Sequence, residues 1–157
     1  MYKRQTQQST IDLIKSKVIS TGPVIALDKG LINVTNGALI NLTHGSNMKV
    51  TGDLLSLING SKINVVNGPL ISAAGVGSQL SVSGALVNFG GTGGNKIVVN
   101  NGIAPTATLN GLPVSATLGG SVNIGPNPVT NPSLGNISVT GSLISATNGG
   151  KVDIKGP

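Results

Sequence analysis

The feature that most constrains this chain is an internal repeat, marked by glycine, with a period of about 15–16 residues. Each unit contains a glycine, a short apolar run, a turn with Asn or Gly, and a second short segment of alternating character. The glycines that open these units are Gly22, Gly37, Gly52, Gly68, Gly84, Gly111 and Gly141. A unit this short cannot bury its own apolar face, so the repeat predicts units that stack along an axis.

Apolar and small polar residues alternate within each unit, which is the period of a β-strand. The third residue after the opening glycine is Ile25, Ile40, Leu55, Ile71, Val87, Val114 or Ile144. Equal positions in stacked units would pair about 4.8 Å apart. We therefore predict an all-β fold, a single-stranded parallel β-helix (β-solenoid) with coils of about 15–16 residues. An antiparallel β-sandwich is the alternative, but it would not require equal periods and aligned columns.

The composition of the 157 residues agrees with a thin coil. Charged residues make up 9% and aromatic residues 1% of the chain, while 24 residues are glycine. A narrow lumen accommodates Ile, Val, Leu and Ala, and its corners require residues that tolerate a positive φ angle. The chain contains one His, no Cys and no Glu, which leaves little material for acid–base, thiol or metal chemistry.

The repeat also divides the chain. Residues 1–21 are expected to form a polar lead-in followed by a degenerate first coil or cap, and residues 22–157 the solenoid, with insertions near 90–110 and 126–136. For residues 9–21 a worn coil is favoured over a short amphipathic helix with Thr10 as its N-cap.

One apolar column is ambiguous, because strict alternation would place it outside, where it would form a stripe that requires a partner. If the corner turns at this position, the side chains point inward instead, and we expect this second arrangement. The column consists of Val24, Leu39, Leu54, Leu70, Leu86 and Leu143.

Catalytic and metal-binding motifs are weak. The glycine-rich stretch 90–97 approaches a calcium-binding nonapeptide, but it occurs once and has Asn95 where an Asp ligand is needed. Asp28, Asp53 and Asp153 occupy different positions of the repeat, and His44 lies in a turn without a second His or Cys. We therefore predict no enzyme activity, no catalytic or metal site and no cofactor.

Two sets of residues are candidates for an interaction surface. The first consists of residues in the predicted loops: Asn95, Lys96, Asn127 and Asn131. The second is an outer column of hydroxyl and amide side chains just before the opening glycines: Thr21, Asn36, Thr51 and Asn67. A regular column of Thr would be typical of an ice-binding solenoid, but in this column Thr alternates with Asn.

The net charge of +6 comes from ten basic residues and four Asp, and the basic residues beyond position 29 are scattered singly. Nucleic-acid binding favours clustered Lys and Arg together with aromatic residues, so no nucleic-acid partner is predicted. No apolar run is long enough for a membrane helix. The expected partners are neighbouring coils of a longer chain or a second copy bound end to end, and a glycan or other cell-surface ligand.

The segment from Gly141 to Ile154 resembles the coil repeats of filamentous haemagglutinin-like adhesins, and residues 84–94 resemble repeat regions of large bacterial surface proteins. The resemblance covers residues 22–157. It implies a right-handed parallel β-helix, secretion to the cell surface and a role as adhesin, stalk or biofilm component. Two departures are coils shorter than those common in such shafts and the absence of a secretion-targeting domain. The resemblance carries over no functional residue.

Taken together, these patterns predict a non-enzymatic structural or adhesive segment of a larger bacterial protein, located outside the cell or at the outer-membrane surface. The alternatives are a surface-, carbohydrate- or ice-binding β-helix module and, third, a carbohydrate-active β-helix enzyme.

Overall fold

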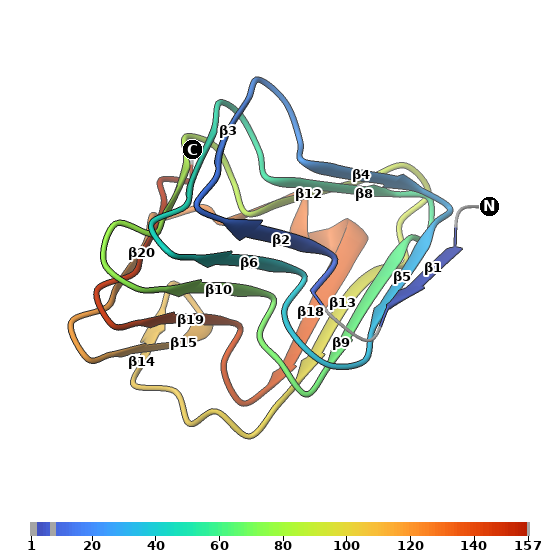
Figure 1. Cartoon of the computed structure of the whole chain (residues 1–157). Helices are drawn as coiled ribbons and strands as arrows, with labels where there is room; N and C mark the ends of the chain where they lie inside the picture. Colours follow the sequence, from blue (N-terminus) through green and yellow to red (C-terminus); the bar gives the residue numbers. More distant parts are fainter. Residues whose placement is uncertain (1–2, 7–8, 157) are drawn as a thin grey trace.

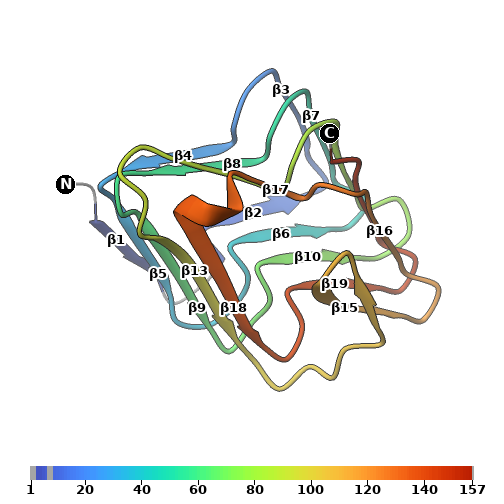
Figure 2. The ribbon, with the colours of Figure 1, turned by 180° about the vertical axis from the view of Figure 1, so that it is seen from behind.

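The computed structural model describes residues 3–6 and 9–156. The chain winds into a β-solenoid of about four turns, whose strands form four walls that we call sheets A to D (Figures 1 and 2). In the described part of the chain, all strand pairs are parallel apart from one antiparallel pair, which joins two strands of sheet B. The predicted all-β solenoid is confirmed.

Each sheet collects strands from successive turns. From one edge to the other, sheet A contains β1 (Lys3–Thr6), β5 (Leu31–Val34), β9 (Lys62–Val66), β13 (Asn95–Asn100) and β18 (Gly135–Thr140). Sheet B contains β14 (Ala107–Leu109), β15 (Leu112–Thr117), β19 (Ile144–Thr147), β10 (Ile71–Ala74), β6 (Ile40–Thr43) and β2 (Ile11–Ile14). Sheet C contains β16 (Ser121–Ile124), β20 (Lys151–Ile154), β11 (Gln79–Val82), β7 (Asn47–Val50) and β3 (Lys17–Ser20). Sheet D contains β17 (Val129–Thr130), β12 (Val87–Gly90), β8 (Leu55–Ile58) and β4 (Ile25–Asp28); a 3₁₀-helix, η1 (Pro132–Leu134), precedes β18.

One complete turn takes four strands and therefore two repeat units. Ile40 pairs with Ile71 and Leu55 pairs with Val87, so the chain passes a second opening glycine before it returns to the same column. The predicted coil of about 15–16 residues is therefore wrong, because it is half of the observed turn. Two strands and one corner enclose only half of the perimeter, and a second repeat unit has to close the ring around the buried side chains.

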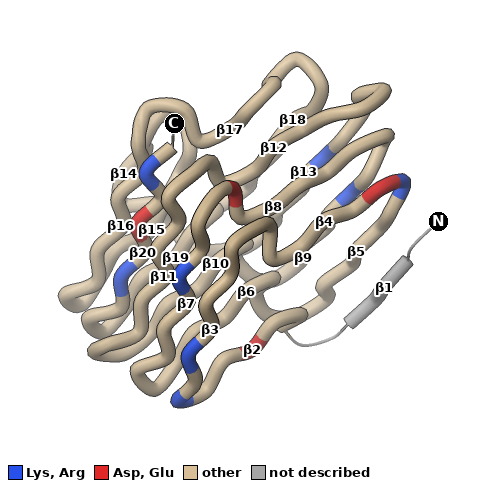
Figure 3. Tube along the Cα trace, turned by 90° about the horizontal axis from the view of Figure 1, so that it is seen from above, with Lys and Arg blue, Asp and Glu red and all other residues tan. Residues whose placement is uncertain are grey.

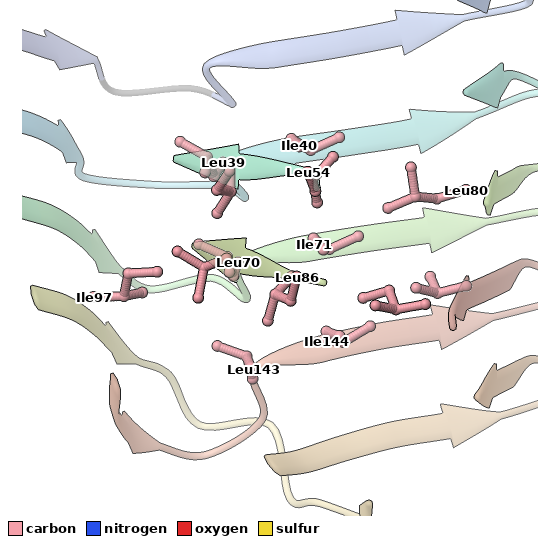
Figure 4. Close-up of a cluster of buried hydrophobic side chains, with 14 of the residues drawn as sticks. Leu39, Ile40, Leu54, Leu70, Ile71, Leu80, Leu86, Ile97, Leu143 and Ile144 are labelled. Atoms are coloured by element: carbon pink, nitrogen blue, oxygen red, sulfur yellow. The ribbon is translucent and has the colours of Figure 1, made fainter. Parts of the chain in front are cut away.

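The lumen is filled by the apolar columns that the alternation predicts. The column that could have lain outside points inward, because the chain turns a corner there: Leu39, Leu54, Leu70, Leu86 and Leu143 are all 0% exposed (Figure 4). Its first member, Val24, is partly buried in the first turn. The stacked side chains form one continuous core, which explains how so short a repeat becomes stable.

The corners between sheets B and C and between sheets D and A are held by buried hydroxyl groups. Ser46 Oγ donates to Thr43 O (2.7 Å) and accepts from Ser16 N of the previous turn (3.1 Å). Ser61 repeats both kinds of bond, with Ile58 O in its own corner and the amide of Gly30 in the turn before. A single side chain therefore satisfies polar groups of two successive turns, which fixes the stacking as well as the bend.

Residues 9–21 form two strands and therefore half of a turn. The segment contains β2 and β3, which pair with β6 and β7 in the same registers as later turns. The worn coil is thus confirmed, and the alternative of a capping helix is wrong.

The last two turns do not stack in chain order. In sheets A and D each new strand pairs at the end of the stack. In sheets B and C, by contrast, the final strand enters between two strands that precede it in the chain. Strand β19 lies between β10 and β15, and β20 lies between β11 and β16. Figure 1 shows the red β19 between the green β10 and the orange β15. The connection at 101–106 runs from β13 to the end of the stack at β14, whereas the connection at 140–143 runs from β18, at the end of the stack, back to the internal strand β19. The two connections therefore have to cross.

Candidate functional site: the outer faces and loops

The predicted loop residues lie in different environments. Asn95 is 1% exposed, so its prediction as a contact residue on a loop surface is wrong. Its Oδ1 accepts from the amides of Gly60 and Ser61, and its Nδ2 donates to Gly90 O and Leu134 O. The glycine-rich stretch therefore uses this amide to join two successive turns and η1, which consumes its hydrogen-bonding capacity.

The other three residues of that set are exposed. Lys96 projects from β13 directly beside Lys62 of β9. Asn131 starts η1 with a φ angle of 56°, and its Nδ2 donates to Phe89 O (3.1 Å). Asn127 lies near the other end of the same connection. The structure does not bring Lys96 into the same sheet as this connection, which pairs with sheet D through β17.

The predicted outer column splits in two, because one turn holds two repeat units. Asn36 and Asn67 lie at the corner between sheets A and B, where Asn67 Nδ2 donates to Asn36 Oδ1 (3.3 Å). Thr51 lies at the corner between sheets C and D, and its amide donates to Ser20 O beside Thr21. All four residues are exposed, but no single face presents Thr and Asn in alternation.

Asp12, Asp28 and Asp53 take part in contacts between turns. Asp12 Oδ1 accepts from Asn41 Nδ2 (3.0 Å), Asp28 Oδ1 from Asn59 Nδ2 (2.8 Å), and Asp53 Oδ1 from the amide of Ala85 (2.7 Å). Among the described residues, no group of three or more His, Cys, Asp or Glu side chains could hold a metal ion. Each of these three carboxylates thus accepts a hydrogen bond that links two successive turns.

His44 occupies the turn where the sequence places it. It is exposed, has a φ angle of 57°, and its Nδ1 lies 3.1 Å from Thr43 Oγ1. That environment is a solvated corner of the solenoid.

Sheet C presents a basic outer face. Lys17, Lys49 and Lys151 project from β3, β7 and β20, Lys155 follows β20, and all four are exposed. Figure 3 shows these lysines distributed over this side of the solenoid. Asp153, on β20, adds a carboxylate to the same face.

A shallow groove of about 260 Å³ runs across the same face, and ammonium and hydroxyl groups line it. The polar residues in its lining are Lys49, Thr51, Ser81, Ser83, Asp153 and Lys155. The ammonium and hydroxyl groups among them can donate hydrogen bonds to hydroxyls and carboxylates, whereas the carboxylate of Asp153 accepts. Sequence reasoning missed the groove because its members come from three turns and become neighbours only through the pairing of complete turns.

Sheet A carries a second groove of about 370 Å³ with a different chemistry. Asn33 and Asn64 form an amide ladder (2.9 Å), and Val66 and Val98 provide apolar surface beside it. Val66 is 44% exposed. A mixed amide and apolar surface can contact a sugar ring, but it lacks the charge of the groove on sheet C.

Sheet B carries a ladder of small hydroxyl side chains from the small polar column of the repeat. Ser72, Ser145 and Ser115 are register neighbours, but Ser145 and Ser115 are 7% and 4% exposed. Beside them, Thr147 pairs with Thr117. Because two of the serines are buried, this face does not present a regular array of hydroxyls to solvent.

Comparisons with protein-family models, with curated proteins and with solved structures gave no match for this chain. The resemblance to haemagglutinin-like repeats therefore stands on the level of architecture, as a β-solenoid. The described residues include no helix that is both long and apolar enough to span a membrane.

Proposed function

We propose that this chain is a non-enzymatic structural and adhesive β-solenoid segment of a larger bacterial protein at the cell surface or outside the cell. The observation that carries the proposal is the row of strand edges along the first turn, with which another turn can pair. Strands β1, β2, β3 and β4 are the outermost strands of their sheets in the described part of the chain.

A pocket of about 340 Å³ also lies at this end. Partly buried Ile11, Val24 and Ile25 line it, together with Leu27 and Ile32, which are 4% and 3% exposed. Open strand edges around an apolar end favour the addition of another turn, either from a longer chain or from a second copy. A rod of this kind would hold the loops and outer faces at a fixed spacing from its anchor.

The test is association at this end. We expect the purified chain to form elongated species as its concentration rises, measured by sedimentation velocity and small-angle X-ray scattering. Ile25→Lys places a charge in the open end and should shift association to higher concentration. Ile19→Lys is the matched control, because Ile19 lies on the same turn but is 67% exposed on the outer face. Monomeric behaviour of the unaltered chain at all concentrations, or equal effects of both variants, would contradict the proposal.

A carbohydrate-binding role is the second candidate, and the groove on sheet C favours it. Lysines above a groove lined by hydroxyls match the carboxylates and hydroxyls of an acidic polysaccharide. The probe is polygalacturonate, with binding measured by affinity electrophoresis at two salt concentrations.

Lys49→Gln combined with Lys155→Gln should weaken that binding roughly fivefold, with a smaller effect at high salt. Lys62→Gln combined with Lys96→Gln removes the same charge from sheet A and is the matched control. Equal weakening by both pairs would show that the net charge of the chain, rather than the groove, attracts the polymer.

A further inference from the structure

The C-terminal strand pair fills an internal slot of the solenoid. Ile144, Ala146 and Ile154 are all 0% exposed. Val122 and Ile124, which lie one place further out, are 9% and 8% exposed, although they precede the inserted strands in the chain. The inserted pair is thus the better covered of the two, and its loss would expose the β10–β11 layer.

The two walls of the slot are in matching register. Ile144 has Ile71 as its partner on one side and Val114 on the other. In sheet C, Val152 has Leu80 and Val122 as partners. The slot therefore offers a regular pair of strand edges, and the hydrogen bonds that fill it depend on main-chain geometry.

One side chain holds the crossing of the two connections. Asn101 Oδ1 accepts from the amides of Ile103 (2.9 Å) and Ser142 (3.1 Å). Its Nδ2 donates to Gly68 O (3.1 Å) and Ser142 O (2.8 Å). Asn101 thereby ties the outgoing connection, the incoming connection and the turn beneath them. Gly141 passes so close that a Cβ atom there would collide with Asn101 Oδ1.

This order departs from the usual rule that successive elements lie side by side and that connections do not cross. Strands β15 and β16 come first in the chain, and β15 has Val-Ser-Ala-Thr where β19 has Ile-Ser-Ala-Thr. The segment 112–124 can therefore reach the β10–β11 edge before the segment 141–156 does. For the observed order to form, β19 and β20 must enter between β10–β11 and β15–β16 after those strands have folded.

We propose that residues 141–156 are an exchangeable strand pair, which a second copy of this chain can supply to the slot. Apart from the link at Thr140, this segment is joined to the slot and to the Asn101 corner by contacts that would be identical between copies. Exchange of a terminal element of this kind is a low-cost route to a dimer. Chain concentration during folding would decide between the closed and the exchanged form.

The absence of cysteine makes the exchange directly measurable. Ser81 and Asp153 are register partners across β11 and β20. Adjacent strands place Cα atoms within the range that a disulfide can bridge. The full-length double variant Ser81→Cys, Asp153→Cys should form a disulfide within one chain. When the two single variants are unfolded together and refolded at high concentration, they should form a disulfide-linked heterodimer after oxidation.

The matched control uses the same column one turn earlier. Lys49 and Ser81 are also register partners, but consecutive turns join them. The single variants Lys49→Cys and Ser81→Cys, refolded together, should give no heterodimer above the collisional background. Positions 81 and 153 lie within the stack, so end-to-end association does not produce this link and the two proposals fail separately. A heterodimer yield no higher than in the control would overturn the exchange, and failure of the double variant to close would overturn the strand order.

Asn101→Ala tests, in the same assay, whether the hydrogen bonds of Asn101 hold residues 141–156 in place. Loss of its hydrogen bonds should raise the heterodimer fraction, or its rate of formation from mixed native monomers, by roughly tenfold. Asn67→Ala is the matched control, since Asn67 lies at the same corner one turn earlier and bonds to Asn36. Equal effects of the two variants would overturn the role of Asn101, while the experiment with Asn101 intact decides the exchange itself.

Discussion

Ile11 and Ile144 occupy the same column of sheet B, and they show how differently the two ends of the solenoid are constructed. Ile11 is half-buried beside the open pocket of the first turn, whereas Ile144 is covered on both sides by β10 and β15. The antiparallel β14 forms the outer edge of sheet B at the C-terminal end. The hairpin thus covers the edge of sheet B at this end, whereas β18, β16 and β17 are the outermost strands of sheets A, C and D there.

Position in the stack, rather than the residue itself, decides how much a side chain stabilises a solenoid. Neighbouring turns interact almost entirely with each other, so a turn with one neighbour gains about half of the interface. This difference between the ends can be measured, and the largest effect is expected in local opening.

Amide hydrogen exchange should differ most strongly between the two ends. Strands β19 and β20 should exchange only through opening events close to global unfolding, whereas β2 and β3 should open locally. We expect a difference in protection on the order of 10³-fold, measured by exchange followed by mass spectrometry. Equal protection would mean that the first turn is already covered by another copy, which dilution would then reverse.

Truncation of the two isoleucines sharpens the same comparison. Ile144→Ala should lower the free energy of unfolding by about 3 kcal/mol, because it leaves a cavity in a fully packed layer. Ile11→Ala should cost roughly 1 kcal/mol, since water reaches that side chain in the native state. Chemical denaturation of both variants measures the difference, and similar costs would contradict the contrast between the ends.

Among the corner side chains, the loss in unfolding free energy should increase with the number of hydrogen bonds that a substitution removes. Asn95→Ala would remove four hydrogen bonds to main-chain groups at a buried corner, and of these groups Gly90 O keeps the amide of Asn59 as a donor. We expect a loss of about 2–3 kcal/mol in unfolding free energy. Ser61→Ala, at the corresponding corner one turn earlier, removes two bonds and should cost about 1–2 kcal/mol. Urea titrations of the two variants are the measurement, and a larger cost at Ser61 would show that the number of bonds is not decisive.

The smallest change in unfolding free energy is expected for side chains on the outer faces of the sheets, which are exposed to solvent at both ends of the solenoid. Asn64→Ala removes the hydrogen bond to Asn33 on the outside of sheet A. Solvent replaces that partner, so the free energy of unfolding should change by no more than about 0.5 kcal/mol. A change in the midpoint of thermal unfolding beyond the value measured for Asn67→Ala would indicate that amide ladders contribute more than surface hydrogen bonds usually do.

Much of the architecture was predictable from the sequence because it depends on local periodicity. The alternation around Met48 and Val50, and around Ile63 and Val65, identifies the inward faces, and all four side chains are buried. The inward turn of Leu39 and its column was also predictable, since a corner must follow the opening glycine. These features depend only on which residues are neighbours in the chain.

The perimeter of the turn was not predictable in the same way. The period of the repeat states how often the pattern returns, but not how many units close a ring. The column of Thr21, Asn36, Thr51 and Asn67 was consequently placed on one face, whereas the structure distributes it over two corners. Asn95 was misjudged for a related reason, because the groups that bury it belong to the previous turn and to η1.

By itself, the sequence determined that this chain forms stacked parallel strands with Leu, Ile and Val inside and Asn, Ser, Thr and Lys outside. Strand period, glycine corners and the lack of large aromatic residues permit few other arrangements. Only the tertiary structure decided that four strands make one turn, that Lys49 and Lys155 border one groove, and that β19 and β20 enter between earlier strands. Near-identical repeats fit any neighbouring layer in the same register, so their order depends on contacts between distant residues such as Asn101 and Ser142.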